Sequence, residues 1–444
     1  MRIPLSEVAS VLGSRLDTAD TASGWSVDTR TLEPGDVFFA LRGPNHDGHD
    51  HVAMAFEKGA VAAVVERDGD GGPAIRVADT LAAMQALSAW ARQRWGGDII
   101  AITGSAGKTT TKEAVARMLA VRGPVGKTAG NFNNHVGVPL SLLRLPEEAR
   151  LGVIEIGMNH AGEIRDLARL ARPDVAVVTN AGFAHIENFD SIEGVAAAKR
   201  ELVESLGEDG TAVLNADDPR VIRFGGAHKG PTLTYGLTEA AQVRAEEVEL
   251  NAAGVRFRVG NTWFESPVAG RIGVSNLLAG IAVAGLYGIE PGELVEAART
   301  FEPARMRGAR FKHDGILIFD DCYNANPDAV RAMLDVLRDA PADRRIAVLG
   351  EMLELGRWAE PLHREVGRYA AVCGIDVLVG IRGVARHLVD AAMDGGLAKD
   401  AAFFFSDPEE AGSHVKTIAR PGDAILFKGS RGTHVERALE RFLG

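Results

Sequence analysis

The sequence predicts an α/β fold in three domains, with mainly parallel sheets in the central and C-terminal domains. Short apolar runs alternate with helix-period stretches twice, once in the middle of the chain and once near its end, which is typical of covered sheets. A length of 444 residues is too great for one core and suggests about three domains. A Gly-rich loop joins a strand to a helix within residues 99–118, and the rest of the chain is organised around it.

Composition narrows the class of protein. Hydrophobic residues make up 46% and charged residues 25%, as in an ordinary globular enzyme. The formal net charge of −11 argues against non-specific binding to nucleic acid or a membrane, so local lysines and arginines must meet any anionic ligand. The two cysteines, Cys322 and Cys373, are far apart and outside metal-type spacing, which fits a reducing compartment. Cys322 is expected to be a small, semi-buried side chain.

The N-terminal domain is expected to span residues 1–97. Its first residues, MRIPLSEVASVLG, predict a short helix capped by Ser6, and no signal peptide or spanning segment is recognised, so we expect a cytoplasmic protein. A strand over 37–41 precedes a polar loop over 42–50, and a helix over 78–95 leads into the next domain. A ligand-binding or structural loop is favoured over a metal site on His46, His49 and His51.

The central domain is expected to span residues 98–304. Its predicted strands, each ending in a polar cluster, are 99–103, 152–156, 175–179 and 211–214. Ligands of open α/β sheets bind at the carboxyl ends of the strands, so these clusters should converge on the Gly-rich loop. A hairpin insertion is expected over 243–266, with its turn at Gly260 and Asn261, followed by an apolar helix over 274–287.

The Gly-rich loop, residues 104–110, has the character of a phosphate-binding loop. The helix after it buries one face through Val115, Met118 and Leu119. Backbone N–H groups of such a turn point at an anion, the Lys108 ammonium adds a mobile positive charge, and the hydroxyl after it can hold Mg²⁺. The loop is one spacing short of the usual nucleotide loop, which leaves a strand-to-helix turn with a chance lysine as the alternative.

Other side chains could complete a nucleotide site. Glu155 ends a predicted strand and is a hard oxygen ligand of the kind that Mg²⁺ prefers, although such a glutamate is more often solvated or paired. His185 is either a hydrogen-bonded loop histidine or a second-metal ligand. Lys199 lies in a predicted helix and is a surface lysine by pattern. The amide-rich segment 131–134 is either a turn-rich loop or a site for a polar substrate.

The C-terminal domain is expected to span residues 305–444, after a linker at 301–303. The strand–helix alternation restarts there and predicts a second doubly wound sheet. Its predicted strands are 316–319, 346–349, 377–379 and 424–427. The strands end in the polar segments DDCYNANP (320–327), GEM (350–352) and KGSR (428–431).

Motifs along nearly the whole chain resemble those of the Mur ligases in order and approximate spacing. They are GSAGKTTTKE (104–113), NFNNHVGVP (131–139), EIGMNHAGEI (155–164), TNAGFAHIENF (179–189), DDCYNANP, VLGEMLELG (348–356) and KGSR. A block with DTR, GDVFFALRG and DGHD (28–50) is similar to the N-terminal uridine-nucleotide domain of that family.

The resemblance implies a UDP-binding N-terminal domain, a central P-loop ATPase-type domain and a Rossmann-like C-terminal domain that contacts ATP and the acceptor. ATP would phosphorylate the terminal carboxylate of a UDP-muramoyl peptide, which converts a carboxylate oxygen into a leaving group, and an amine would attack the acyl phosphate. YNANP with VLGEMLELG favours the member that adds D-alanyl-D-alanine to UDP-N-acetylmuramoyl-tripeptide for peptidoglycan synthesis. A cytoplasmic monomer that uses ATP and two Mg²⁺ ions is implied.

The family's site residues carry over onto matching positions of this chain. ATP contacts are implied for Gly104, Ser105, Ala106, Gly107, Lys108, Thr109, Thr110, Asn276, Arg307 and Asp321. Metal positions are Thr109, Glu155, His185 and Lys199, the last only if carbamoylated, because an ammonium repels a cation. Lys108, Glu155, His185 and Lys199 are the implied catalytic residues. UDP-substrate contacts are implied for Thr29, Arg30, Arg42, Asp47, Gly48, His49, Asn131, Asn133 and Asn134. Acceptor-side residues are Asn324, Asn326, Lys428, Ser430 and Arg431.

Some positions leave the assignment of site residues and of function open. Arg305 and Arg310 leave the register of Arg307 undecided, and Ile272 stands where the family often has a histidine, four residues before the retained Asn276. The alternatives are a Mur-type ligase that adds a single amino acid, a folylpolyglutamate synthetase and a catalytically idle nucleotide-binding scaffold. The N-terminal block argues against the folate enzyme, and the intact metal positions argue against the scaffold.

Overall fold

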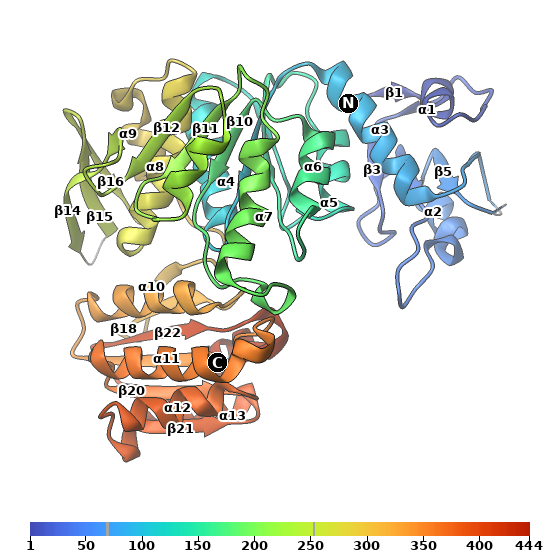
Figure 1. The fold of residues 1–444 in the computed structure, drawn as a ribbon. Coiled ribbons are helices and arrows are strands. Elements are labelled where there is room, and N and C mark those ends of the chain that lie inside the picture. Colours follow the sequence, from blue (N-terminus) through green and yellow to red (C-terminus); the bar gives the residue numbers. More distant parts are fainter. Residues whose placement is uncertain (68–70, 252–253) are drawn as a thin grey trace.

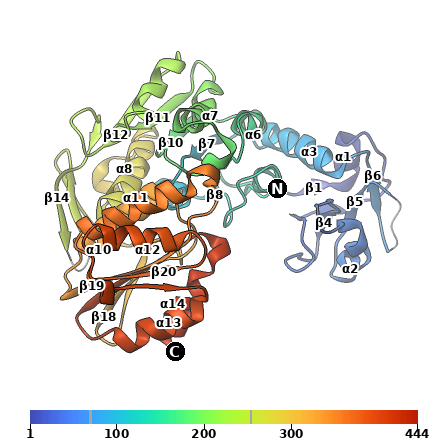
Figure 2. The same ribbon diagram turned by 60° about the horizontal axis from the view of Figure 1, so that its bottom comes forward.

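The computed structural model describes residues 1–67, 71–251 and 254–444. Its three largest sheets belong to successive parts of the chain and define an N-terminal, a central and a C-terminal unit. In Figures 1 and 2 the N-terminal unit and the C-terminal unit lie on different sides of the central unit, and helix α3 (Thr80–Trp95) leads from the first to the second. Both views therefore confirm the predicted α/β architecture with three units.

The N-terminal unit holds a four-stranded parallel sheet in the order β3-β4-β5-β6. Its apolar strand residues, among them Trp25 and Phe39, are buried against α3 and the neighbouring helices. The predicted N-cap is wrong: α1 begins after Pro4, and Ser6 lies inside its first turn. The elements of this unit are β1 (Ile3–Pro4), α1 (Leu5–Val11), β2 (Thr21–Ala22), β3 (Gly24–Ser26), β4 (Asp36–Phe39), α2 (Val52–Glu57), β5 (Ala62–Val65) and β6 (Ala74–Arg76).

The central unit is built on seven parallel strands in the order β13-β12-β11-β10-β7-β9-β8. The four strands predicted for this region are present, with bounds shifted by no more than one residue at either end. The strands are β7 (Asp98–Thr103), β8 (Val125–Lys127), β9 (Leu151–Glu155), β10 (Val175–Val178), β11 (Thr211–Asn215), β12 (Thr232–Gly236) and β13 (Val243–Arg244).

Helices cover both faces of the central sheet, as a parallel sheet requires. Val115, Met118 and Leu119 of α4 are buried, which confirms the predicted face of the helix after the Gly-rich loop. Helix α8 packs on α4 and begins at Gly270, four residues before the predicted 274. The helices are α4 (Lys108–Leu119), α5 (Gly137–Leu143), α6 (Glu163–Ala171), α7 (Ile192–Glu204), α8 (Gly270–Leu286) and α9 (Pro291–Arg299).

The predicted hairpin insertion is confirmed as part of a small antiparallel sheet of β14 (Glu246–Asn251), β15 (Gly254–Val259) and β16 (Thr262–Ser266). Strands β15 and β16 are joined at Gly260 and Asn261, and the rings of Phe257 and Phe264 stack between them with centroids 5.3 Å apart.

The C-terminal unit has six strands in the order β17-β18-β22-β19-β20-β21, and every pairing except that of β17 with β18 is parallel. Cys322 and Cys373 are buried free thiols; Cys322 was expected to be semi-buried and is fully buried. The elements are β17 (Ala309–His313), β18 (Ile316–Asp321), α10 (Pro327–Arg338), β19 (Arg344–Gly350), α11 (Ala359–Val372), β20 (Val377–Ile381), α12 (Ala385–Asp394), β21 (Ala402–Phe405), α13 (Pro408–Ile418), β22 (Asp423–Lys428) and α14 (Val435–Leu443).

A continuous apolar core crosses from the central unit into the C-terminal one. Ile186 and Val195 of the central unit belong to the same buried cluster as Met352 and Leu355 of the C-terminal unit. This shared core joins the two units. Within the part of the chain that the structure describes, no helix is long and apolar enough to cross a membrane.

Candidate active site

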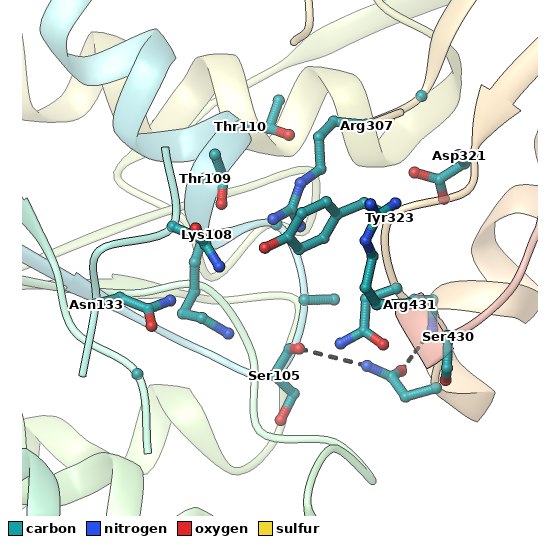
Figure 3. A pocket seen from close by; sticks show the side chains of 18 of the residues that line it. Ser105, Lys108, Thr109, Thr110, Asn133, Arg307, Asp321, Tyr323, Ser430 and Arg431 are labelled. Atoms are coloured by element: carbon teal, nitrogen blue, oxygen red, sulfur yellow. Dashed lines mark hydrogen bonds between the residues drawn. The ribbon is translucent and has the colours of Figure 1, made fainter. Parts of the chain in front are cut away.

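A cavity of about 480 Å³ lies between the central and C-terminal units. Figure 3 shows Lys108, Thr109 and Thr110 on one side of it and Asp321, Ser430 and Arg431 on the other, with Arg307 and Tyr323 between them. The predicted convergence on the Gly-rich loop is confirmed for the clusters that follow β9 and β10, whose residues line this cavity. The cluster after β11 does not line it: Asn215 and Asp218 bond to the backbone of Thr179 and Ala181 instead. Residues at the ends of β18 and β22 complete the cavity from the C-terminal unit.

The phosphate loop is a tight turn between β7 and α4. Gly104 has φ 153°, and a Cβ there would lie 1.8 Å from Thr179 Oγ1, so the turn requires glycine at this position. Lys108 Nζ donates to the Gly104 carbonyl at 2.8 Å, which places the ammonium across the mouth of the loop. Burial lowers the pKa of Lys108, while the negative charge of Glu155 opposes that shift. Ser105 to Thr110 line the cavity; Gly104 lies behind them and shapes the turn.

A neighbouring loop, residues 180–185, supports the phosphate loop from the side. The Asn180 side chain accepts a hydrogen bond from the Ala106 N–H at 2.8 Å and donates to the Ala106 carbonyl at 3.0 Å. The Ser105 N–H donates to the Asn180 carbonyl at 3.1 Å. Sequence reasoning did not single out Asn180, although it lies in the TNAGFAH motif.

Glu155, the last residue of β9, is buried at the centre of the cavity wall. Its Oε2 accepts a hydrogen bond from the Thr109 hydroxyl at 2.9 Å, and its Oε1 accepts one from Asn133 Nδ2 at 2.7 Å. A carboxylate and a hydroxyl at this spacing are both oxygen ligands, so the donor set fits Mg²⁺. Over the ranges described, no group of three or more His, Cys, Asp or Glu side chains is arranged to hold a metal.

Lys112 is a buried cation that sequence reasoning missed. Its Nζ donates to the carbonyls of Thr128 and Gly130 at 2.9 and 3.1 Å, and it lies 3.1 Å from Glu113 Oε1. The same Nζ is 3.9 Å from Glu155 Oε2. Lys112 thus ties helix α4 to the start of the amide-rich segment. Its spacing of four residues from Lys108 on one helix was the signal that could have found it.

His185 faces a carboxylate from the C-terminal unit. Its Nδ1 lies 2.7 Å from Glu354 Oε2, and this close contact lowers the pKa of Glu354. Both residues line the cavity and both have positive φ, 58° and 62°. Glu354 lies in the VLGEMLELG motif, but only the packing of the two units brings it to His185.

Lys199 of α7 is buried, so its prediction as a surface lysine is wrong. The side chain does not line the cavity. Burial, and secondarily the charge of Lys108, lower the pKa of Lys199 well below its usual value. A cation at this position is disfavoured, and the neutral amine is correspondingly easier to form.

The C-terminal wall carries the predicted acceptor-side residues and the aromatic ring of Tyr323. The Arg307 guanidinium lies 3.5 Å from the centroid of that ring, and Arg307 lines the cavity, whereas Arg305 is exposed beside Glu440. Lys428 pairs with Asp321 and donates to the Asn324 carbonyl at 2.9 Å. All five acceptor-side residues line the cavity: Asn324, Asn326, Lys428, Ser430 and Arg431.

The predicted UDP-substrate residues fall into two groups. Asn131, Asn133 and Asn134 line the cavity. The other six lie in the N-terminal unit, outside the cavity lining: Thr29, Arg30, Arg42, Asp47, Gly48 and His49.

The loop around Asp47 is tightly braced in the N-terminal unit. His49 Nδ1 lies 2.6 Å from Asp47 Oδ1, and His49 Nε2 accepts a hydrogen bond from the Glu66 N–H at 2.9 Å. Arg42 lies 3.4 Å from Asp47 and 3.2 Å from Glu66. Both ring nitrogens of His49 therefore contact other residues of this unit. This arrangement is consistent with the prediction that the segment is a ligand-binding or structural loop and not a metal site.

The position of Ile272 forms part of an apolar patch of the cavity wall together with Val268 and Ala269. One helical turn on, Asn276 is buried and its Oδ1 accepts a hydrogen bond from the Thr111 hydroxyl at 3.1 Å. Asn276 thus braces α8 against the first turn of α4, beside the phosphate loop.

The fold and the cavity define a nucleotide-binding α/β protein whose site is completed by a further domain. Three family descriptions match the chain: "Mur ligase family, catalytic domain" over residues 21–93, "Mur ligase middle domain" over 102–284 and "Mur ligase, glutamate ligase domain" over 304–431. The chain belongs to the Mur ligase family.

Several relatives that match nearly the whole chain carry the same name. The UDP-N-acetylmuramoyl-tripeptide–D-alanyl-D-alanine ligase of Bacillus subtilis is 35% identical, over 94% of this chain and 92% of that protein. The crystal structure of MurF from Acinetobacter baumannii matches with a TM-score of 0.90 and 30% identity, covering 100% of this chain and 99% of that one. MurF ligase from Thermotoga maritima in complex with ADP matches with a TM-score of 0.82 and 28% identity, covering 95% and 97%.

Proposed function

We propose that this chain is an ATP-dependent ligase that adds D-alanyl-D-alanine to UDP-N-acetylmuramoyl-tripeptide and releases ADP and phosphate. This reaction is the last cytoplasmic step in making the peptidoglycan precursor. The observation that carries the proposal is the cavity in which a phosphate loop faces the DDCYNANP segment of another domain. The relatives named above, which match nearly the full chain, support the same reaction.

The chemistry requires two displacements in one cavity. An oxygen of the tripeptide carboxylate attacks the γ-phosphorus of ATP, and the bond from that phosphorus to ADP breaks. The amine of D-alanyl-D-alanine then attacks the carbonyl carbon, phosphate leaves with the bonding pair, and the new amide nitrogen loses a proton. Lys108 and Arg307 bring positive charge to the cavity where phosphate oxygens carry negative charge.

Thr109 and Glu155 would hold the first Mg²⁺, and their oxygen donors, 2.9 Å apart, fit that ion. A bound Mg²⁺ would neutralise charge on the phosphates during transfer. His185 and a carbamoylated Lys199 are proposed for a second ion. The lowered pKa of Lys199 supports this, because the neutral amine is the form that adds CO₂. The amine nitrogen bonds to the carbon of CO₂, the electron pair of one C=O π bond moves onto its oxygen, and the nitrogen releases a proton.

The remaining assignments follow from the same proposal. We place the UDP-sugar-binding domain at residues 1–97, the ATP-binding domain at 98–304 and the Rossmann-like acceptor domain at 305–444. The loop of Arg42, Asp47 and His49 is proposed to meet the UDP end of the substrate, and Asn131, Asn133 and Asn134 its peptide side. We further propose a cytoplasmic monomer.

Phosphate release tests the proposed acceptor. Purified protein is expected to release phosphate from ATP only when UDP-N-acetylmuramoyl-tripeptide and D-alanyl-D-alanine are both present. Turnover with a single amino acid in place of the dipeptide would move the chain to a sister ligase. Binding of ATP without any phosphate release would instead indicate a nucleotide-binding scaffold.

A further inference from the structure

The first turn of α10 lies against the loop 180–185 of the central unit. Asp328 Oδ2 accepts a hydrogen bond from the Phe183 N–H at 3.0 Å, and Arg331 donates to the other carboxylate oxygen, Oδ1, at 2.8 Å. A Cβ at Gly182 would lie 2.0 Å from Asp328 Oδ2. The approach of the carboxylate therefore depends on glycine at position 182. In Figure 1, α10 is the C-terminal helix that faces the central unit.

The same loop grips the phosphate loop on its other side. The Ser105 hydroxyl donates to the Gly182 carbonyl at 2.9 Å and accepts from the Gly182 N–H at 2.8 Å. With the Asn180 contacts to Ala106, this makes the loop 180–185 the immediate support of the phosphate loop. The loop also ends in His185, which lines the cavity.

A second contact joins α10 directly to the phosphate loop. Asn326 Nδ2 donates to the Ser105 carbonyl at 3.3 Å, while its Oδ1 caps α10 by accepting from the Ala329 N–H at 2.9 Å. Asn324 and Asn326, two residues of the proposed acceptor side, thus immediately precede the helix whose Asp328 holds the supporting loop. The segment 324–328 therefore carries proposed acceptor-side residues and also contacts the phosphate loop and the loop that supports it.

We propose that Asp328 is a positioning residue. By holding the Gly182–Phe183 backbone it fixes the loop 180–185, and through that loop it fixes the position of the phosphate loop relative to the acceptor-side segment. The inference rests on the proposed ligase function. Nothing in this role requires Asp328 to touch a substrate, and the residue is absent from the cavity lining. A carboxylate suits the task because hydrogen bonds to a charged acceptor are about twice as strong as neutral ones.

Because residue 182 is a glycine, a single added methyl group can test the contact with Asp328. In Gly182→Ala the three heavy atoms nearest to the new methyl group all belong to Asp328, so the methyl group should push the carboxylate away and lower kcat about tenfold or more. Asp328→Ala should lower kcat by a similar factor, with a smaller change in the KM for ATP. In the double variant the methyl group has no carboxylate to meet, so kcat should equal that of Asp328→Ala alone.

Controls separate positioning from general stability. Gly207→Ala adds a methyl group that meets nothing within 4 Å and should leave kcat unchanged. Asp328→Asn keeps an oxygen acceptor and should retain more kcat than Asp328→Ala. If the two single losses multiply in the double variant, or if Asp328→Asn and Asp328→Ala are equally impaired, the proposal is wrong. Should Asp328→Ala fail to fold, Asp328→Asn and Gly182→Ala still provide the comparison with wild type.

Amide hydrogen exchange tests the contact without any ligase assay. The Phe183 N–H should exchange about tenfold faster in Asp328→Ala than in wild type, and in Gly207→Ala it should exchange at the wild-type rate. Unchanged exchange at Phe183 in Asp328→Ala would overturn the proposal. If wild type shows no ligase activity but Phe183 exchange depends on Asp328, the proposed function fails and the contact stands.

Discussion

The Thr109 hydroxyl donates to Glu155 Oε2 at 2.9 Å, which joins the first turn of α4 to the end of β9. The two residues are 46 positions apart in the sequence and come from neighbouring parallel strand–helix connections. This hydrogen bond holds the start of α4 and the carboxylate that we propose for Mg²⁺ in one corner of the cavity. Asn133 binds the other oxygen of the same carboxylate, so the amide-rich segment belongs to this corner too.

Replacing Glu155 should change the Mg²⁺ dependence of the rate more than it changes nucleotide binding. Glu155→Gln keeps the shape and the Asn133 contact region but removes the charge that a divalent cation needs. We expect kcat to fall by about 100-fold or more, with a higher Mg²⁺ concentration for half-maximal rate. A Mg²⁺ titration of the rate measures both values.

The matched control is Glu163→Gln, which removes a partly exposed carboxylate from the same cavity wall. Its Mg²⁺ dependence should match that of wild type. Equal Mg²⁺ requirements for wild type and Glu155→Gln would remove Glu155 from the metal site.

Lys112 should matter for stability because its charge is fully buried and satisfied by two carbonyls and Glu113. Lys112→Met removes the donor to the two buried carbonyls and one of the two cations beside Glu113. We expect the free energy of unfolding to drop by about 3 to 5 kcal/mol. Lys127 pairs with the same Glu113 from a half-exposed position, so Lys127→Met should cost only about 1 kcal/mol or less. Urea unfolding of both variants checks the difference, and similar losses for the two would contradict the assigned role.

The Asp47 carboxylate makes the N-terminal loop sensitive to acid. The backbone N–H of His49 is the largest cause that lowers the pKa of Asp47 from 3.8 to about 2. A carboxyl group whose pKa is lower in the folded state contributes stability above its unfolded pKa and loses it as the pH falls through the folded value. The Asp47→Asn variant should therefore have a lower Tm than wild type near pH 7, and the gap should close between pH 4 and pH 2. A gap that stays constant over this range would show that the charge of Asp47 does not stabilise the loop.

The strands and the phosphate-loop motif could be predicted because they depend on residues that are close together in the sequence. The apolar runs around Ile99 and Val175 gave correct strands because each is short, buried and closed by polar residues, and the motif around Lys108 marked the cavity. The prediction of Ser6 as the N-cap was wrong because Pro4 occupies that position, and Ser6, two residues later, already lies inside the helix. Errors of this kind arise within one or two residues of an element boundary.

Contacts between units could not be read from the sequence. The contact of His185 with Glu354 and the hydrogen bond from the Phe183 N–H to Asp328 join segments about 145 to 170 residues apart, and none of these residues carries a periodic signal. Lys199 was wrongly predicted to be exposed for a related reason: its helix α7 packs against α6, β7 and β10, and periodicity alone does not reveal which helix faces are covered.

The central claim is that ATP activates the tripeptide carboxylate before the dipeptide attacks it. Tripeptide labelled with ¹⁸O in its terminal carboxylate should pass a labelled oxygen to the released phosphate during turnover with D-alanyl-D-alanine, and Lys108→Ala should show neither turnover nor transfer. Phosphate released without label, while the amide product forms, would contradict the account.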